Sequence, residues 1–142
     1  MQVLIRNKQK MPVNRKRLKA LAERLLRAES CGEDAEVSIL LTDDKSITIL
    51  NKQYRDIDGP TDVLSFAQAE GDDFPSEPGE TLLGDVVISV ETAARQAGEQ
   101  SHDLDEEMDV LLAHGLLHLL GYDHAEPDEE REMLAKQELY VG

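Results

Sequence analysis

Apolar residues along this chain follow two different periods, and these periods predict its helices and strands. Apolar residues that recur every three or four positions indicate helices, whereas short apolar or alternating runs between turn residues indicate strands. The first pattern predicts helices over residues 14–29, 42–54, 91–99, 104–120 and 127–140. The second pattern predicts strands over residues 3–5, 36–41, 62–66 and 82–90.

Several of the predicted helices carry end signals. Asn14 has the side chain of an N-cap, and Asp103 with Glu106 resembles a capping box. Pro127 suits the first turn of the last helix. The helix over residues 104–120 is apolar on nearly all sides, which predicts a central, buried position.

The predicted order of elements is β-α-β-α-β-β followed by helices, which indicates an α+β fold: a small four-stranded mixed sheet packed with about five helices. A right-handed crossover places the first two strands parallel. The last two strands could form an antiparallel hairpin across an acidic loop over residues 68–80. Because 142 residues suit a single core and no linker divides the chain, we expect residues 1–142 to form one domain.

Three histidines near the end of the predicted central helix are the clearest sign of chemistry. His114 and His118 are one helical turn apart, so both imidazoles can reach one ion. Gly121 can adopt the left-handed conformation that ends a helix, which would turn His124 back toward them. Three nitrogen ligands with an open fourth position are typical of a catalytic zinc site. The alternative is that these are ordinary core histidines.

The histidine spacing matches the metalloprotease pattern H-E-x-x-H-x-x-G-x-x-H at every position but one. Gly115 stands where that pattern has the glutamate that acts as general base. Because a peptide's leaving amine needs a delivered proton, losing this base disfavours peptide hydrolysis. The sequence therefore favours hydrolysis of a charged substrate over a metallopeptidase or amidase with a displaced base.

Bulk composition indicates the compartment. The apolar fraction is 40%, and no apolar run approaches the roughly 18 residues that span a bilayer. The N-terminus lacks a charged-then-apolar secretory signal. Cys31 is the only cysteine, which excludes an intramolecular disulfide. We therefore expect a cytoplasmic protein without a membrane partner.

The net charge of −15 is unevenly distributed. Residues 1–27 carry nine Lys or Arg and one Glu, a net +8, so the remainder carries −23. The overall charge disfavours tight non-specific binding to nucleic acid. The basic helix could still contact RNA phosphates locally, or it could be a solvated helix face. The candidate RNA contacts are Arg15, Lys16, Arg17 and Lys19.

A second group of functional residue types lies between the second helix and the third strand. Arg55 could bind phosphate through two parallel hydrogen bonds and offset charge in a transition state. Alternatively, it is a surface arginine paired with Asp56 or Asp58. Asp62 could orient a ligand histidine, or it could cap the turn that follows Pro60.

The general base is not evident. Asp85 is a polar residue within the apolar run of the fourth strand, where it either faces outward or has a function. Asp85 and Asp123 are candidate bases, as are a substrate phosphate and a second water molecule.

Three motifs together give the chain a resemblance to the YbeY family of bacterial endoribonucleases and ribosomal RNA maturation factors. They are N-x-x-Y-R followed by P-T-D-V-L-S-F within residues 51–66, L-G-D-V-V-I-S over residues 83–89, and H-G-x-L-H-L-x-G-Y-D-H over residues 114–124. The element order also fits, so the resemblance covers essentially the whole chain. Ala67 stands where a proline is common, and the acidic loop is particular to this chain.

This resemblance implies a zincin-like α+β fold whose metal site lies on the central helix of the C-terminal half. It implies one divalent metal, usually zinc, on His114, His118 and His124. It also implies single-strand-specific endoribonuclease activity, used in 3′-end maturation of small-subunit ribosomal RNA and in ribosome quality control. The family's critical arginine and first histidine fall on Arg55 and His114, the expected catalytic residues.

The expected partners are single-stranded RNA and a ribosomal protein or assembly GTPase, with no nucleotide cofactor. Three histidines accept zinc, nickel, cobalt or iron, so they do not fix the metal. A rival function is a ribosome-assembly binding module whose metal is only structural. That rival predicts that loss of metal unfolds the domain while Arg55→Ala leaves function intact.

Overall fold

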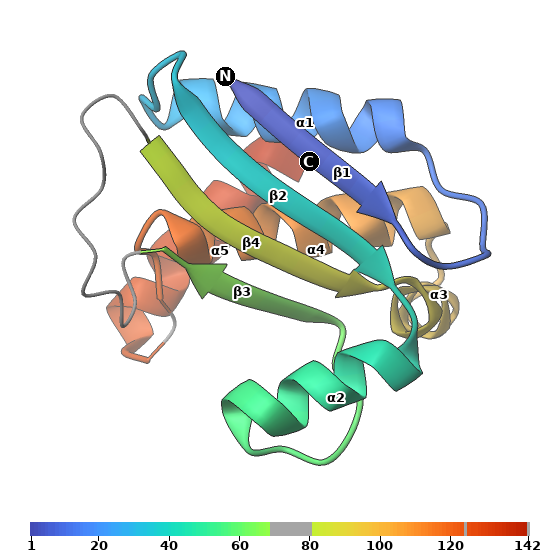
Figure 1. Cartoon of the computed structure of the whole chain (residues 1–142). Coiled ribbons are helices and arrows are strands. Elements are labelled where there is room, and N and C mark those ends of the chain that lie inside the picture. The colour runs from blue at the N-terminus through green and yellow to red at the C-terminus, as the bar shows by residue number, and fades with distance from the viewer. Residues whose placement is uncertain (69–80, 124, 142) are drawn as a thin grey trace.

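The computed structural model describes residues 1–68, 81–123 and 125–141, and it confirms every predicted element (Figure 1). In chain order the elements are β1 (Gln2–Asn7), α1 (Arg15–Ala28), β2 (Ala35–Thr42), α2 (Asp44–Arg55), β3 (Val63–Ala67), β4 (Thr81–Ser89), α3 (Val90–Glu99), α4 (Leu104–Leu119) and α5 (Pro127–Val141). The acidic loop predicted over residues 68–80 lies outside the described residues except for Gln68.

The sheet is mixed and four-stranded, as predicted, with the order β1-β2-β4-β3. β1 runs parallel to β2, and β3 pairs antiparallel with β4, which confirms both predicted pairings. β4 also pairs in parallel with β2, so it lies between β2 and β3. Among the described strands, β3 is therefore at an edge of the sheet.

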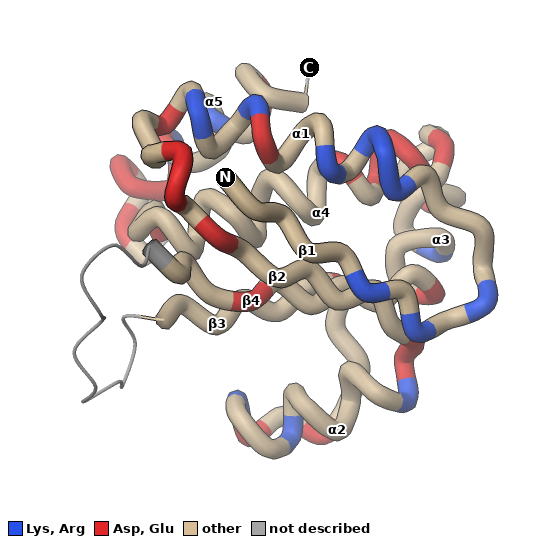
Figure 2. Tube along the Cα trace, turned by 45° about the horizontal axis from the view of Figure 1, so that its top comes forward, with Lys and Arg blue, Asp and Glu red and all other residues tan. Residues whose placement is uncertain are grey.

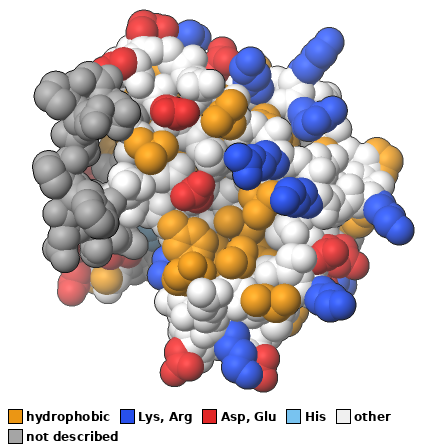
Figure 3. Space-filling model, viewed as in Figure 1, with side chains coloured by type: hydrophobic (Ala, Val, Ile, Leu, Met, Phe, Trp, Pro, Cys, Tyr) orange, Lys and Arg blue, Asp and Glu red, His pale blue; other side chains and the backbone are white. Residues whose placement is uncertain are grey.

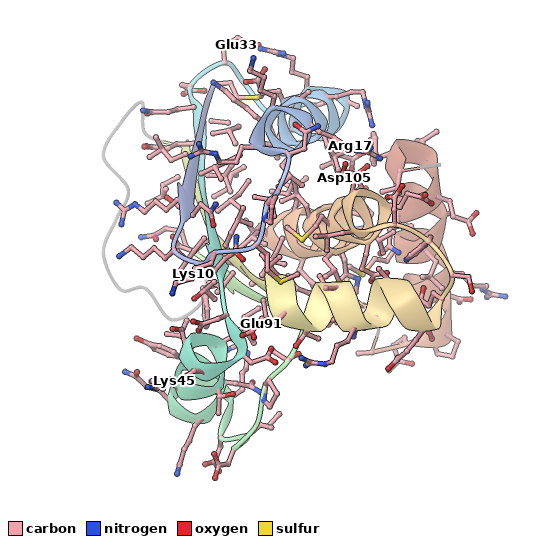
Figure 4. All side chains as sticks on the ribbon, turned by 90° about the vertical axis from the view of Figure 1, so that its right-hand side faces the viewer. Lys10, Arg17, Glu33, Lys45, Glu91 and Asp105 are labelled. Carbon is pink, nitrogen blue, oxygen red and sulfur yellow. The ribbon has the colours of Figure 1, made fainter. Side chains whose placement is uncertain are left out.

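The two faces of the sheet are covered unequally. Helices α1, α3, α4 and α5 lie on one side, whereas α2 lies against the other near one end of the sheet (Figures 1 and 4). Because successive side chains of a strand point to opposite faces, Val86 and Ile88 of β4 join the main core with α4. Val87, between them, joins a smaller cluster with Ile47 of α2 and Leu64 of β3.

Helix α4 is the central helix, as its apolar sequence predicts. Leu112 and Leu116 are fully buried within the main core. The side chain of Asp103 accepts a hydrogen bond of 2.8 Å from the backbone N–H of Glu106, which confirms the predicted start. Gly121 follows the helix with φ of 100°, the left-handed conformation expected there. Among the described residues, none of the helices is long and apolar enough to cross a membrane.

Candidate functional site

The histidines of α4 and Arg55 of α2 line one hollow between β3 and α4. The hollow has a volume of about 290 Å³, and β3 supplies most of the rest of its lining. The ring centroids of His114 and His118 lie 4.7 Å apart, with an interplanar angle of 77°. This is the proximity expected for two residues one helical turn apart. The fold thus joins the two sequence motifs that contain Arg55 and these histidines.

The guanidinium of Arg55 is held in place by neutral groups. Its Nη2 donates a hydrogen bond of 2.7 Å to the carbonyl of Ser65. Its central carbon lies 5.0 Å from the ring centroid of Phe66, which is close enough for a cation–π interaction. The ring of Tyr54 meets Phe66 edge to face, with 5.2 Å between centroids. These contacts fix the position of the cation without neutralising its charge.

The alternative of a surface ion pair for Arg55 finds no support among the described residues. The Nζ of Lys52 lies 3.9 Å from a carboxylate oxygen of Asp58, so that carboxylate has a different cation beside it. No described carboxylate forms an ion pair with Arg55. We therefore interpret Arg55 as a site residue that faces the hollow.

Ser65 joins the two sides of the hollow, and the sequence did not single it out. Its carbonyl accepts the hydrogen bond from Arg55, and its hydroxyl donates a hydrogen bond of 3.2 Å to the carbonyl of Gly115. Gly115, the residue after His114, is therefore hydrogen-bonded to β3, the same strand that accepts the hydrogen bond from Arg55. The only signal for Ser65 was its place inside the P-T-D-V-L-S-F motif.

Gly115 has a packing reason to lack a side chain. A Cβ atom built there would lie 2.7 Å from Cγ1 of Val86 and 3.3 Å from Cγ2 of Val63. Position 115 therefore faces the sheet at close range, and a glutamate there would have to push α4 away from it. The departure from the metalloprotease pattern has a steric cause in this fold, which counts against a peptidase.

Gly84 lets β3 and β4 come close beside the hollow. It has φ of 138°, a conformation that residues with a side chain rarely adopt. A Cβ atom there would collide with the carbonyl oxygen of Phe66, the residue on which Arg55 rests. The glycine of the L-G-D-V-V-I-S motif thus helps to place Phe66.

The ring of His114 also borders a second hollow, on the side of α3 and α5. This hollow has a volume of about 260 Å³, and its lining includes Asp62 and Gln137. The Nδ1 of His114 lies 3.2 Å from Oε1 of Gln137, a partner that sequence analysis missed because nothing in the local sequence marks it. Asp62 instead accepts a hydrogen bond of 2.7 Å from the backbone N–H of Val63, as in the turn-capping alternative.

The third predicted metal ligand, His124, lies outside the described residues. Within the part of the chain that the structure describes, no three His, Cys, Asp or Glu side chains are grouped so that they could hold a metal ion. The positive φ of Gly121 is the turn that the prediction requires before His124. Asp123 lines an acidic hollow together with neighbouring residues of that turn, with Glu29 at the end of α1 and with Glu129 of α5.

Asp85 lies on the opposite face of the sheet from the histidines. It lines a groove of about 460 Å³ beside α2, together with Arg6, Lys8, Tyr54 and other residues. In Figure 3 hydrophobic side chains gather on this face with Lys and Arg side chains beside them. The outward-facing alternative for Asp85 therefore describes its position, and its carboxylate is not in the lining of the histidine hollow.

The basic N-terminal region follows β1, the connection after it and α1 (Figure 2). One of its candidate RNA contacts also has a structural partner: the guanidinium of Arg17 donates hydrogen bonds of 2.9 and 2.7 Å to Asp109 and lies 3.9 Å from Asp105 (Figure 4). At 1.5 Å per residue, Asp109 is about 14 Å along α4 from His118. Arg17 thus connects α1 to the N-terminal half of α4, whereas both histidines lie in its C-terminal half.

A half-buried carboxylate at the end of α1 fixes α5 beside the turn that follows α4. Glu29 accepts hydrogen bonds from Nζ of Lys136 at 3.1 Å, from the hydroxyl of Tyr122 at 2.5 Å and from the hydroxyl of Tyr140. Burial raises the pKa of Glu29, but these hydrogen bonds together outweigh it, and the pKa lies below its ordinary value. Burial and the neighbouring Glu29 raise the pKa of Tyr140 to about 12.

The fold and the hollow define an α+β protein in which a central helix presents paired histidines to an arginine beside an edge strand. The profile of the family described as Endoribonuclease YbeY matches residues 4–142. The chain belongs to this family, as the three sequence motifs predicted.

Relatives and a solved structure agree with this assignment. A protein of Pelotomaculum thermopropionicum named Endoribonuclease YbeY is 51% identical over 121 residues, which cover 85% of this chain and 80% of the relative. One of the same name from Thermobifida fusca is 45% identical over 147 residues, covering 100% of this chain and 94% of the relative. The solution structure of a Thermotoga maritima protein is 29% identical, with a TM-score of 0.67, covering 98% of this chain and 86% of that one.

Proposed function

We propose that the chain is a metal-dependent endoribonuclease that hydrolyses phosphodiester bonds of single-stranded RNA. The observation that carries this proposal is that Arg55, His114 and His118 line one hollow. The names of the curated relatives, Endoribonuclease YbeY, support RNA as the substrate. We also propose that residues 1–142 form one catalytic domain.

The described residues fit a divalent metal through their chemistry. His114 and His118 present two imidazoles to one hollow, and imidazole is a ligand for zinc, nickel, cobalt and iron. These two residues would hold the metal, with His124 as the third ligand. A bound metal would supply Lewis-acid activation of water or of a phosphoryl oxygen. Zinc is the metal that the family resemblance favours.

Arg55 would bind the phosphate that is cut. Its guanidinium can donate two parallel hydrogen bonds to phosphate oxygens and offset the charge that develops on them. The contacts with Ser65 and Phe66 hold the cation before substrate arrives, so little reorganisation is needed. Asp85 is a poor candidate for the general base, because it lies on the other face of the sheet. A substrate phosphate, a second water molecule and Asp123 stay candidates.

The biological role is proposed from the family resemblance. We propose that the substrate is ribosomal RNA, that the activity serves 3′-end maturation of the small-subunit RNA and ribosome quality control, and that the protein acts in the cytoplasm. The net charge of −15 disfavours unaided RNA binding. A ribosomal protein or an assembly GTPase would therefore deliver the substrate.

The test is cleavage of a labelled single-stranded RNA by zinc-loaded protein, compared with Arg55→Ala, His114→Ala and Lys52→Ala. Lys52 is a matched control because it is a cation on the same helix that does not line the hollow. We expect Arg55→Ala to remain folded and to lose roughly 10²- to 10³-fold in cleavage rate, and Lys52→Ala to cleave normally. Equal cleavage by all four proteins would refute the proposal. Unfolding upon metal removal, with a fully functional Arg55→Ala, would favour the binding-module rival.

A further inference from the structure

The contact between His114 and α5 determines how one histidine can be used. The imidazole of His114 borders both hollows, whereas Gln137 lines only the second. The Nδ1 atom lies on the side of Gln137, 3.2 Å from its amide oxygen. The ring therefore forms part of the wall between the two hollows.

An amide oxygen can only accept a hydrogen bond, so this contact requires Nδ1 of His114 to carry the proton. In a neutral imidazole the other nitrogen, Nε2, then carries no proton and can act as an acceptor or a metal ligand. That is the tautomer in which Nε2 can bind a metal in the hollow shared with His118. A partner on the second nitrogen is the usual means of fixing the tautomer and orientation of a ligand histidine.

Gln137 is itself held in a defined position. It lies on the inner face of α5, one turn after Met133, which is buried in the main core. On the same face Lys136 and Tyr140 donate hydrogen bonds to Glu29, which anchors this part of α5 against the end of α1. The amide oxygen is therefore placed by the docking of the whole helix.

We infer that Gln137 is a positioning residue that holds His114 as the Nδ1–H tautomer and so prepares Nε2 to bind the metal. This inference rests on the proposed metal site and deepens it. It assigns to α5, which contributes none of the motif residues, a defined part in the site. The role requires a hydrogen-bond acceptor at position 137, and the negative charge of a carboxylate is not needed.

The test compares Gln137→Met, which keeps the length of the side chain and removes the acceptor, with Gln137→Glu, which keeps an acceptor. Gln96→Met is the matched control, because Gln96 lines the same second hollow from α3. The first readout is the tautomer of His114 in metal-free protein, measured by two-dimensional ¹H–¹⁵N spectra of the imidazoles at mildly alkaline pH. The second is zinc affinity, measured by competition with a chromophoric chelator.

We expect the parent, Gln137→Glu and Gln96→Met to hold the Nδ1–H tautomer and to bind zinc within a few-fold of one another. Gln137→Met should shift His114 toward the other tautomer and weaken zinc binding by about 10- to 100-fold. An unchanged tautomer in Gln137→Met, or a Gln137→Glu protein that behaves like Gln137→Met, would overturn the inference. The tautomer readout needs neither metal nor RNA, so a parent protein that fails to cut RNA would refute the proposed function and leave this inference standing.

Discussion

Substitution of Gly115 by alanine tests how closely α4 packs on the sheet beside the histidines. The new Cβ would lie 2.7 Å from Cγ1 of Val86 and 3.3 Å from Cγ2 of Val63. Val86 is fully buried, and a β-branched side chain has little freedom to change its rotamer. The helix or the strand must therefore shift, and such overpacking costs about 1–3 kcal/mol.

A second effect opposes this cost. Alanine favours a helix over glycine by about 1 kcal/mol, so we expect Gly115→Ala to lower the free energy of unfolding by up to about 2 kcal/mol. In a Val86→Ala background the closest contact is gone. There, Gly115→Ala should raise the free energy of unfolding relative to Val86→Ala alone, by up to about 1 kcal/mol.

Urea denaturation of the four proteins of this cycle measures the coupling between the two positions, expected at about 1–3 kcal/mol. Gly98→Ala is the control, because Gly98 lies in α3 and no described residue that packs on the helix lies within 4 Å of a built Cβ. It should be stabilising by up to about 1 kcal/mol. If Gly115→Ala changed the free energy of unfolding equally in both backgrounds, contact with Val86 would not be the reason for glycine at position 115.

Two further predictions concern the stability of the C-terminal third. Because the fold lowers the pKa of Glu29 below its ordinary 4.5, its contribution to stability should be fully present above that pH and lost as pH falls through its native pKa. Acid titration of the thermal midpoint should show this loss, and Glu29→Gln should remove it; parallel curves would contradict the assignment. Gly121→Ala should lower the free energy of unfolding by about 1–2 kcal/mol, because φ of 100° is strained for a residue with a side chain. An unchanged stability in calorimetry would show that this turn does not need a glycine.

The parts of the fold that follow from local sequence were predicted well. The helix over residues 104–120 has an apolar pattern, a capping start and a terminal glycine, all within about 18 residues of one another, and the structure has α4 at Leu104–Leu119. His114 and His118 meet because one helix sets their spacing. The insertion of β4 between β2 and β3 was not predicted, because which parallel strands become neighbours depends on how helices pack across the sheet.

The site was predicted less completely for the same reason. Nothing in the residues around Arg55 indicates that the end of α2 lies beside β3, the strand that faces α4. Only the family resemblance predicts that Arg55 and the histidines share one site. Ser65 and Gln137 are common polar residues whose roles depend on contacts 50 and 23 positions away in sequence. His124 stays a prediction, because it lies outside the described residues.

The hydrogen bond from Arg55 to Ser65 also covers part of the edge strand β3. Ser89 donates its N–H to Asp62, and Gln68 donates to Leu83. By the alternation of antiparallel pairing, the backbone groups of Ser65 point away from β4, to the side of β3 where no described strand pairs with it. Such an edge is a template on which another chain can add a strand, and a charged side chain across it prevents this. Loss of Arg55 would therefore expose this edge of β3 to pairing with another chain. An inactive Arg55→Ala protein thus shows a catalytic role for Arg55 only if its oligomeric state is the same as that of the parent.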